Sequence, residues 1–321
     1  MDAVNKLDAS QYLGFVYGSG FEAQPELLQQ VAELFPLIGN MPLVVRAVKT
    51  PLVFFDVLQR NNIQCPELFK QLHTNDGADV SAVIYLRKLV GGSGGTHIKI
   101  VDDEDVESSN CYYQPYIAGR SVSLLFVAHD NSVTVVGFNE QWVDAVASMP
   151  FRYGGAVSNI VLPQSIRRQL TEAAEKLTVV FGLIGLNSLD AIVQGDSAYI
   201  LEVNPRLSAT VDLYAIDSHE GTHGNLLNWH VNACLEDADF KYENRLVKRS
   251  KAHAIVYAPF DLQIADDFHW PEWVVDNPCN TMQVLAGEPV CTVIAIADSA
   301  DEAKQLAHIR VKMLQLEITT N

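Results

Sequence analysis

Hydrophobic and polar positions follow two periods along the chain, one typical of strands and one typical of helices. Short apolar runs bounded by Gly, Pro, Asn or Asp predict strands at 13–17, 83–86, 97–100, 111–119, 121–128, 133–138, 156–162, 189–193, 199–201, 254–257 and 290–296. Apolar residues three or four positions apart predict helices near 25–34, 51–60, 163–181, 225–236 and 299–316. Strands and helices are interleaved, so the sequence predicts a mixed α/β (α+β) protein.

Two of these strands carry polar side chains that we expect to meet. The strand with Asp190 and the strand with Glu202 and Asn204 are separated by Gly195-Asp196, which predicts a turn and an antiparallel hairpin. Glu202 and Asn204 are two positions apart, so they point to the same face of an extended strand. Carboxylate and amide oxygens suit Mg²⁺ or Mn²⁺. Arg206 follows with a planar donor fork suited to phosphate or carboxylate.

A glycine-rich stretch joins the strands at 83–86 and 97–100. It consists of Gly91, Gly92, Ser93, Gly94 and Gly95. Without Cβ atoms, the backbone N–H groups of such a loop can approach an anion closely. The lysine before the loop, at position 88, can place a charge near a phosphate. A mobile hairpin tip with a solvated lysine is the alternative, and the absence of GK[ST] excludes a Walker A motif.

Composition narrows the class of protein. The chain has 321 residues, 48% of them hydrophobic, and a net charge of −17. That charge argues against nucleic acid and against an anionic membrane surface as partners. The five cysteines have no CxxC spacing, and the sequence has neither a signal peptide pattern nor an apolar run long enough to cross a bilayer. We therefore expect a cytoplasmic protein with reduced thiols.

Residues 219–223, HEGTH, match the HExxH signature of zinc hydrolases. The signature requires a helix, which Gly221 and Gly224 disfavour, and His230 does not complete the extended form of the motif. A zinc hydrolase is therefore a remote alternative. We expect His219 and His223 to line a substrate pocket or to cap a loop.

The motifs, taken in order over residues 40–235, resemble those of the ATP-grasp superfamily. They are Lys49 before a helix, Lys88 with the glycine-rich loop, the hinge Gln114-Pro-Tyr-Ile-x-Gly, and Asp190 followed twelve residues later by Glu-x-Asn-Pro-Arg. More narrowly, YGSGFE near the start and GEPVCTVIAIADSADEA near the end look like ATP-grasp carboligases. That subgroup includes tyramine–glutamate ligase-like proteins and relatives linked to tetrahydromethanopterin C1 metabolism.

The resemblance implies a role for each matching residue. Lys49 and Lys88 would bind the nucleotide phosphates, and the loop 91–95 would fold over them. Gln114 and Ile117 would lie in the hinge, where backbone groups read the adenine edge. Asp190, Glu202 and Asn204 would hold two Mg²⁺ (or Mn²⁺) ions, with Glu202 bridging. Arg206 would hold the transferring phosphoryl group, and with Lys88 would be catalytic.

The implied fold has two α+β lobes that grip ATP. We expect a short N-terminal α/β subdomain at 1–48, lobes at 49–117 and 118–236, and a small C-terminal α+β unit at 237–321. The implied enzyme ligates a small-molecule carboxylate to an amine (or thiol) through an acyl phosphate, in small-molecule or cofactor biosynthesis. The resemblance is also compatible with a homodimer. Many relatives place a ribose-binding Glu where this chain has Ser121. A degenerate ATP-binding sensor or scaffold is therefore the main alternative.

Overall fold

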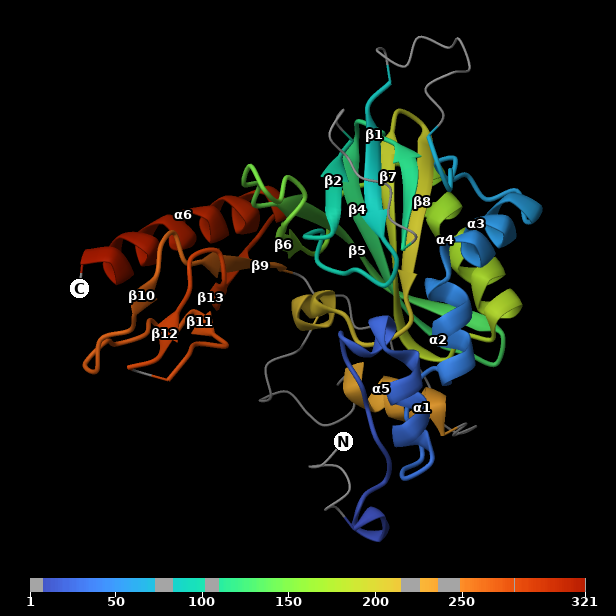
Figure 1. Cartoon of the computed structure of the whole chain (residues 1–321), viewed down its shortest axis with the longest axis horizontal. Coiled ribbons are helices and arrows are strands. Elements are labelled where there is room, and N and C mark those ends of the chain that lie inside the picture. The colour runs from blue at the N-terminus through green and yellow to red at the C-terminus, as the bar shows by residue number, and fades with distance from the viewer. Residues whose placement is uncertain are drawn as a thin grey trace.

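An eight-stranded antiparallel sheet runs through the protein, in the order β11-β13-β9-β6-β5-β4-β7-β8 (Figure 1). The computed structural model describes residues 8–72, 83–101, 110–214, 226–235, 249–279 and 281–320. The strands of this sheet are β4 (Arg120–His129), β5 (Ser132–Val143), β6 (Tyr153–Val157), β7 (Gly185–Gln194), β8 (Ser197–Asn204), β9 (Ser250–Tyr257), β11 (Val274–Val275) and β13 (Pro289–Ala297). The mixed fold of helices and antiparallel strands confirms the predicted class.

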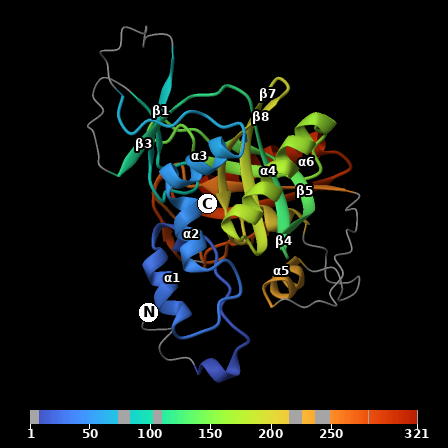
Figure 2. The ribbon, with the colours of Figure 1, turned by 90° about the vertical axis from the view of Figure 1, so that its right-hand side faces the viewer.

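Helices cover one face of this sheet beside β4, β7 and β8. Figures 1 and 2 place α3 (Pro51–Arg60) and α4 (Gln164–Phe181) there. The helical stripe predicted for α4 is buried: Ile166, Leu170, Ala173, Ala174 and Leu177. It packs against inward-facing residues of β4 such as Leu124 and Phe126. Burial of this apolar surface is the main stabilising contribution to this part of the fold.

The other face of β4 is also buried, which explains the nearly continuous apolar run in that strand. Leu125 and Val127 join a second cluster with Leu213 and Trp229. These partners come from the 3₁₀ helix Ala209–Tyr214 and from α5 (Leu226–Cys234). Successive side chains of a strand point to opposite faces, so β4 contributes alternately to the two clusters.

A small sheet, in the order β2-β1-β3, lies over the strands β4, β7 and β8 (Figure 1). It consists of β1 (Tyr85–Leu89), β2 (Ile98–Ile100) and β3 (Cys111–Pro115), all antiparallel. Leu86 pairs with Gln114 and Lys88 pairs with Tyr112. Leu86 and Lys88 are both buried, so one face of this small sheet is turned toward the interior.

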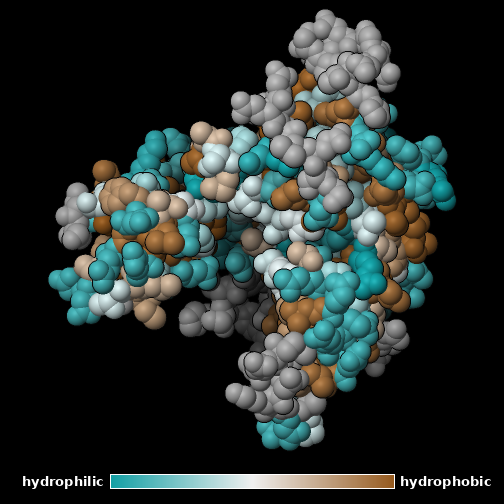
Figure 3. All heavy atoms as spheres, viewed as in Figure 1, coloured by the Kyte–Doolittle hydropathy of each residue, from teal (hydrophilic) through white to brown (hydrophobic). Residues whose placement is uncertain are grey.

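The strands of the expected C-terminal unit extend the same large sheet. β9 pairs with β6, and β13 and β11 follow at the edge, with α6 (Ala300–Thr320) packed on β9 and β13. Strands β10 (Leu262–Gln263) and β12 (Gln283–Val284) form a separate pair. Figure 3 shows a hollow between this part and the rest of the molecule. Strands β9, β11 and β13 therefore share a sheet with the lobe before them.

Two predicted strands are changed in the structure, and one helix was not predicted. The strand expected at 13–17 is reduced to a single bridge between Phe15 and Leu37, because the rings of Phe15 and Tyr17 pack edge-on against Phe21 instead. The strand expected at 156–162 ends at Val157, since Asn159 has a φ of +58°. Helix α2 (Pro42–Lys49) was not predicted: its three valines favour strands, but a proline at the first turn starts a helix.

The N-terminal segment is joined to the end of β8 by buried hydrogen bonds. The Tyr17 hydroxyl donates to the Asn40 carbonyl (2.6 Å), and the Asn40 amide donates to the Pro205 carbonyl (3.0 Å) and to Asn187 (2.9 Å). The Asn40 side-chain oxygen accepts from the Ile184 backbone (2.9 Å). Helix α1 (Pro25–Ala32) packs on α2 beside this junction. No helix within the described residues is long and apolar enough to span a membrane.

Candidate functional site

A cavity of about 630 Å³ lies between the small sheet and the large one. Leu86 and Lys88 of β1 line it on one side, and Gln141 of β5, Asp190 of β7 and Glu202 of β8 line it on the other. Of the residues predicted for the site, Lys88, Gly94, Gly95, Gln114, Ile117, Asp190 and Glu202 all line this cavity. The described lining does not include six other residues predicted for the site: Gly91, Gly92, Ser93, Lys49, Asn204 and Arg206.

The predicted hairpin is present and brings the two acids together. Asp190 pairs directly with Glu202, and the register shifts just after them. Asp190 accepts hydrogen bonds from the side-chain amides of Asn204 (2.9 Å) and Gln141 (3.2 Å). Burial, and next the neighbouring Glu202 carboxylate, raise the pKa of Asp190 above its usual range. Gln141 is a site residue that the sequence analysis missed, because only the pairing of β4 with both β5 and β7 brings it to Asp190.

Lys49 ends α2 and reaches the acid pair. Its ammonium donates to Glu202 (2.9 Å) and to the side-chain oxygen of Asn204 (2.8 Å), and lies 3.1 Å from Glu22. Burial works to lower the pKa of Lys49, but the carboxylates of Glu202 and Glu22 outweigh it and the pKa is raised. For Glu202, burial works to raise the pKa, but Lys49 outweighs it and the pKa is lowered. Lys49 and Glu202 are therefore a charged pair.

Arg206 lies beside Lys49 and shares a partner with it. Its Nε donates to Glu22 (2.8 Å) and its Nη1 to the Leu207 carbonyl (2.9 Å). The Glu22 side chain is only 3% exposed, and those of Lys49 and Arg206 are 10% exposed. Glu22 was missed as a site residue from the sequence, although it stands in the YGSGFE segment that the resemblance singled out. It is brought to the site by the 3₁₀ helix Phe21–Ala23.

The glycine-rich loop lies against the chain that enters β6. The backbone N–H of Tyr153 donates to the Gly94 carbonyl (2.9 Å). Gly95 has a φ of +73°, and a Cβ there would lie 1.8 Å from the Phe151 carbonyl oxygen. Gly91 is also close to other backbone, with an added Cβ 3.2 Å from the Ala23 Cα. Glycine is therefore required for the loop to cover the cavity in this position.

Replacing Gly95 with alanine is expected to weaken ATP binding about tenfold, because the loop must lift away from Phe151 and lose the Tyr153–Gly94 hydrogen bond. Isothermal titration with a non-hydrolysable ATP analogue measures the change. Gly94→Ala is the matched control: its φ is also positive (+65°), but an added Cβ meets nothing within 4 Å. Equal affinities for the two variants would show that the contact with Phe151 does not hold the loop.

The hinge end of the cavity holds a buried amide. The Gln114 side chain is 1% exposed, and neither its nitrogen nor its oxygen has a hydrogen-bond partner among the described residues. A buried amide without partners costs free energy unless a ligand satisfies it. Gln114 lines the cavity, so its amide suits a ligand that offers a donor and an acceptor, as the edge of a nucleotide base does.

Ser121 and Glu140 line the cavity next to this hinge. The Glu140 carboxylate accepts from Arg120 and from Lys304 of α6 (2.6 Å), and the Ser121 hydroxyl contacts Gln141 (3.4 Å). Burial works to raise the pKa of Glu140, but Lys304 and Arg120 outweigh it and lower the pKa. An ionised carboxylate is thus present near the hinge, contributed by β5 instead of the position that follows the hinge glycine.

Tyr153, a further lining residue, is held by a buried histidine. Its hydroxyl lies 2.6 Å from Nε2 of His253, which is 2% exposed. Burial lowers the pKa of His253 to about 4, so the ring is neutral near pH 7 and Nε2 can accept from the Tyr153 hydroxyl. His253 therefore orients a residue of the cavity wall.

Of the three histidines considered for a zinc site, only His230 lies within the described residues. His219, Glu220 and His223 lie outside the described residues. His230 is 1% exposed in α5, with its two ring nitrogens bonded to the backbone of Leu186 and Ile38, both at 2.9 Å. Neither nitrogen is therefore free to bind a metal.

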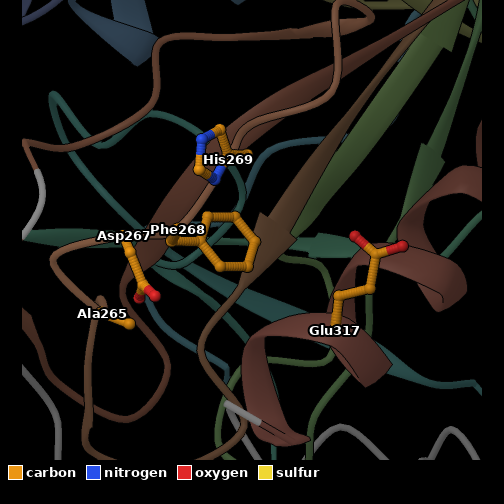
Figure 4. Close-up of a pocket in the computed structure, with 5 residues that line it drawn as sticks. All are labelled: Ala265, Asp267, Phe268, His269 and Glu317. Atoms are coloured by element: carbon orange, nitrogen blue, oxygen red, sulfur yellow. The ribbon is translucent and has the colours of Figure 1, made fainter.

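A second pocket, of about 280 Å³, is lined by residues that come after all the predicted site residues in the sequence. Figure 4 shows Glu317 of α6 opposite a loop with Ala265, Asp267, Phe268 and His269. In the part of the chain that the structure describes, no three His, Cys, Asp or Glu side chains are grouped to hold a metal ion. This pocket therefore provides no metal centre.

The acid pair Asp190 and Glu202 at the main cavity suits a magnesium ion that is also bound by a nucleotide. Mg²⁺ is usually bound by one or two carboxylates together with the phosphates of a nucleotide. Asp190 and Glu202 supply two carboxylates at the wall of a nucleotide-sized cavity, with Lys88 beside them. The donor set therefore fits Mg²⁺ or Mn²⁺ that is shared with a nucleotide.

Known proteins share this architecture. The L-amino acid ligase of Bacillus licheniformis superposes with a TM-score of 0.72 at 16% identity, over 97% of this chain and 82% of that one. The biotin carboxylase domain of 2-oxoglutarate carboxylase from Hydrogenobacter thermophilus, a dimer solved with MgADP, ADP and bicarbonate, gives 0.74 at 11% identity, over 95% and 75%. At such identities the likeness concerns the fold alone.

Sequence comparison agrees with the fold. Residues 51–210 match the ATP-grasp domain family. The carbamoyl phosphate synthase large chain of Pseudomonas aeruginosa is 23% identical over 228 residues, which are 65% of this chain. This chain spans 21% of the length of that relative. The fold and cavity define a two-lobed nucleotide-binding protein. More specifically, the protein belongs to the ATP-grasp superfamily, as its motifs predicted.

Proposed function

We propose that this protein is an ATP-dependent ligase that joins a small-molecule carboxylate to an amine through an acyl phosphate. The observation that carries the proposal is the pairing of Asp190 with Glu202 at the wall of a cavity that also holds Lys88 and the glycine-rich loop. The similarity to an L-amino acid ligase and to a carbamoyl phosphate synthase supports C–N bond formation.

ATP would enter with its base at the hinge and its phosphates under the loop. Gln114, whose buried amide lacks partners, would contact the base together with the backbone around Ile117. Ser121 and Glu140 would supply the oxygens next to the ribose. Lys88 is buried at 7% exposure, and burial lowers its pKa, so a triphosphate is a fitting counter-charge for it.

The reaction has two displacements. A carboxylate oxygen of the substrate attacks the γ-phosphorus, the bond to the bridging oxygen breaks, and ADP leaves. The amine nitrogen then attacks the carbonyl carbon, phosphate leaves with the C–O electron pair, and the nitrogen loses a proton. Asp190 and Glu202 would hold magnesium, which would stabilise the charge on the phosphate oxygens.

The residues of the chain position these groups and stabilise charge. Lys88 at the cavity wall and Arg206 beyond Glu202 provide fixed cations for the oxygens that gain negative charge. No covalent side-chain nucleophile is needed. Several finer points are predictions that rest on the resemblance. They are the identity of the carboxylate, the identity of the amine (or a thiol in its place), the pathway in small-molecule metabolism, and a homodimer.

An assay with hydroxylamine tests the proposal without knowledge of the amine. Hydroxylamine attacks an acyl phosphate and gives a hydroxamate that is detected by colour with ferric iron. We expect a panel of amino acids and other carboxylates, with ATP and Mg²⁺, to yield hydroxamate and ADP in equal amounts for at least one carboxylate. Tight ATP binding with no ADP formation from any carboxylate would favour the sensor or scaffold instead.

A further inference from the structure

The ammonium of Lys49 lies among oxygen atoms, and a metal ion at the site would share some of these oxygens. Three oxygens surround it: Glu202 Oε2 at 2.9 Å, Asn204 Oδ1 at 2.8 Å and Glu22 Oε1 at 3.1 Å. Two of these belong to residues that the ATP-grasp motif assigns to the metal. Lys49 is therefore the cation that these three oxygens share.

The orientation of Asn204 follows from Lys49. Its side-chain oxygen, the only atom that could bind a metal, accepts from Lys49, and its NH₂ donates to Asp190 at 2.9 Å. In this arrangement Asn204 links Asp190 to Lys49, and a metal ion would share its side-chain oxygen with the ammonium. Among the described residues, the side-chain donors that reach Asp190 are two neutral amides, those of Asn204 and Gln141.

Formal charges in the group balance without a divalent ion. Glu22 and Glu202 contribute two negative charges, and Lys49 and Arg206 contribute two positive charges, joined in the chain Arg206–Glu22–Lys49–Glu202. Three of the four side chains are at most 10% exposed, so solvent screens them little. A divalent ion that arrives alone must compete with an ammonium for Glu202 and Asn204.

A nucleotide changes this balance, because its triphosphate brings about four negative charges that can attract both the divalent ion and Lys49. We propose that Lys49 is the resident counter-ion of the acid group and prevents a divalent ion from binding until the nucleotide is present. This inference rests on the proposed function, since it assumes that Asp190 and Glu202 bind the metal. Lys49 then serves as a positioning residue for Glu202 and Asn204.

The test measures Mn²⁺ binding from the electron paramagnetic resonance signal of free Mn²⁺, with and without a non-hydrolysable ATP analogue. We expect wild-type protein to bind Mn²⁺ at least tenfold more weakly without the analogue than with it. Lys49→Met should bind Mn²⁺ without the analogue at least tenfold more tightly than wild type, while Lys49→Arg, which keeps the charge, should not. Lys49→Gln repeats the test if the methionine variant does not fold.

Lys176→Met is the matched control, because Lys176 is exposed on α4 and bonds only the Asn61 carbonyl among the described residues. It should bind Mn²⁺ as wild type does. Tight Mn²⁺ binding by wild type without the analogue, or equal binding by wild type and Lys49→Met, would overturn the inference. Asp190→Asn separates the two proposals: if it keeps Mn²⁺ binding in the presence of the analogue, the metal assignment of the proposed function is wrong.

Discussion

Glu202→Gln is expected to lower ATP-dependent ADP formation by about 10²–10³-fold while the protein stays folded. The loss follows because the variant removes the carboxylate charge that helps to bind Mg²⁺ and to stabilise the transferring phosphoryl group. The fold should persist, since the Glu202 side chain is 43% exposed and glutamine can still accept a hydrogen bond from Lys49. A coupled ADP assay measures the activity, and circular dichroism checks the fold.

Glu175→Gln is the control for this variant, because Glu175 is exposed on α4 away from the cavity lining. We expect its activity to match that of wild type. Unchanged activity in Glu202→Gln would remove Glu202 from the metal site, and with it the main support for a ligase. A loss in both variants would point to a general effect of the substitution on the protein.

Glu22→Gln is expected to lower the free energy of unfolding by about 3 kcal/mol, because it leaves the buried cations Lys49 and Arg206 without a shared carboxylate. Urea denaturation measures the change. The matched control is Glu26→Gln, four residues further along the chain. Glu26 also pairs with an arginine, Arg46 at 3.0 Å, but its side chain is 71% exposed, so the cost should stay below about 0.5 kcal/mol.

Equal denaturation midpoints for the Glu22 and Glu26 variants would contradict the view that the buried ion pairs hold the N-terminal segment on the site. A catalytic readout adds to this test. Because Glu22 contacts Arg206 and lies outside the described lining of the cavity, Glu22→Gln should lower kcat while the KM for ATP changes little. A rise in the KM for ATP alone would place Glu22 at the nucleotide instead.

The remaining alternatives can be weighed against particular residues. The scaffold hypothesis began with the missing acid at position 121, and Glu140 now supplies a carboxylate close to that place. The zinc hydrolase required His219 and His223, which lie outside the described residues, together with a free third histidine. His230 has both ring nitrogens bonded to backbone groups, so it does not provide one.

Local pattern was enough to predict the hairpin that carries the acids. Gly195-Asp196 makes the turn, and a shift of register just after Asp190 then brings Asp190 opposite Glu202. The helices α3, α4 and α6 were equally predictable, because each has proline, glycine or polar residues at its ends and an apolar stripe of helical period. These features depend on neighbours within a few residues along the chain.

The sequence by itself determined the class of fold, the acid hairpin and the glycine-rich loop. Only the tertiary structure decided which charges meet: Glu22 lies 184 positions from Arg206, and Lys49 lies 153 positions from Glu202. It also decided that β9 and β13 extend the large sheet. The physical reason is that a buried ion pair or an added strand depends on which distant segments pack together. That packing is set by the burial of the whole core, and local sequence periodicity does not encode it.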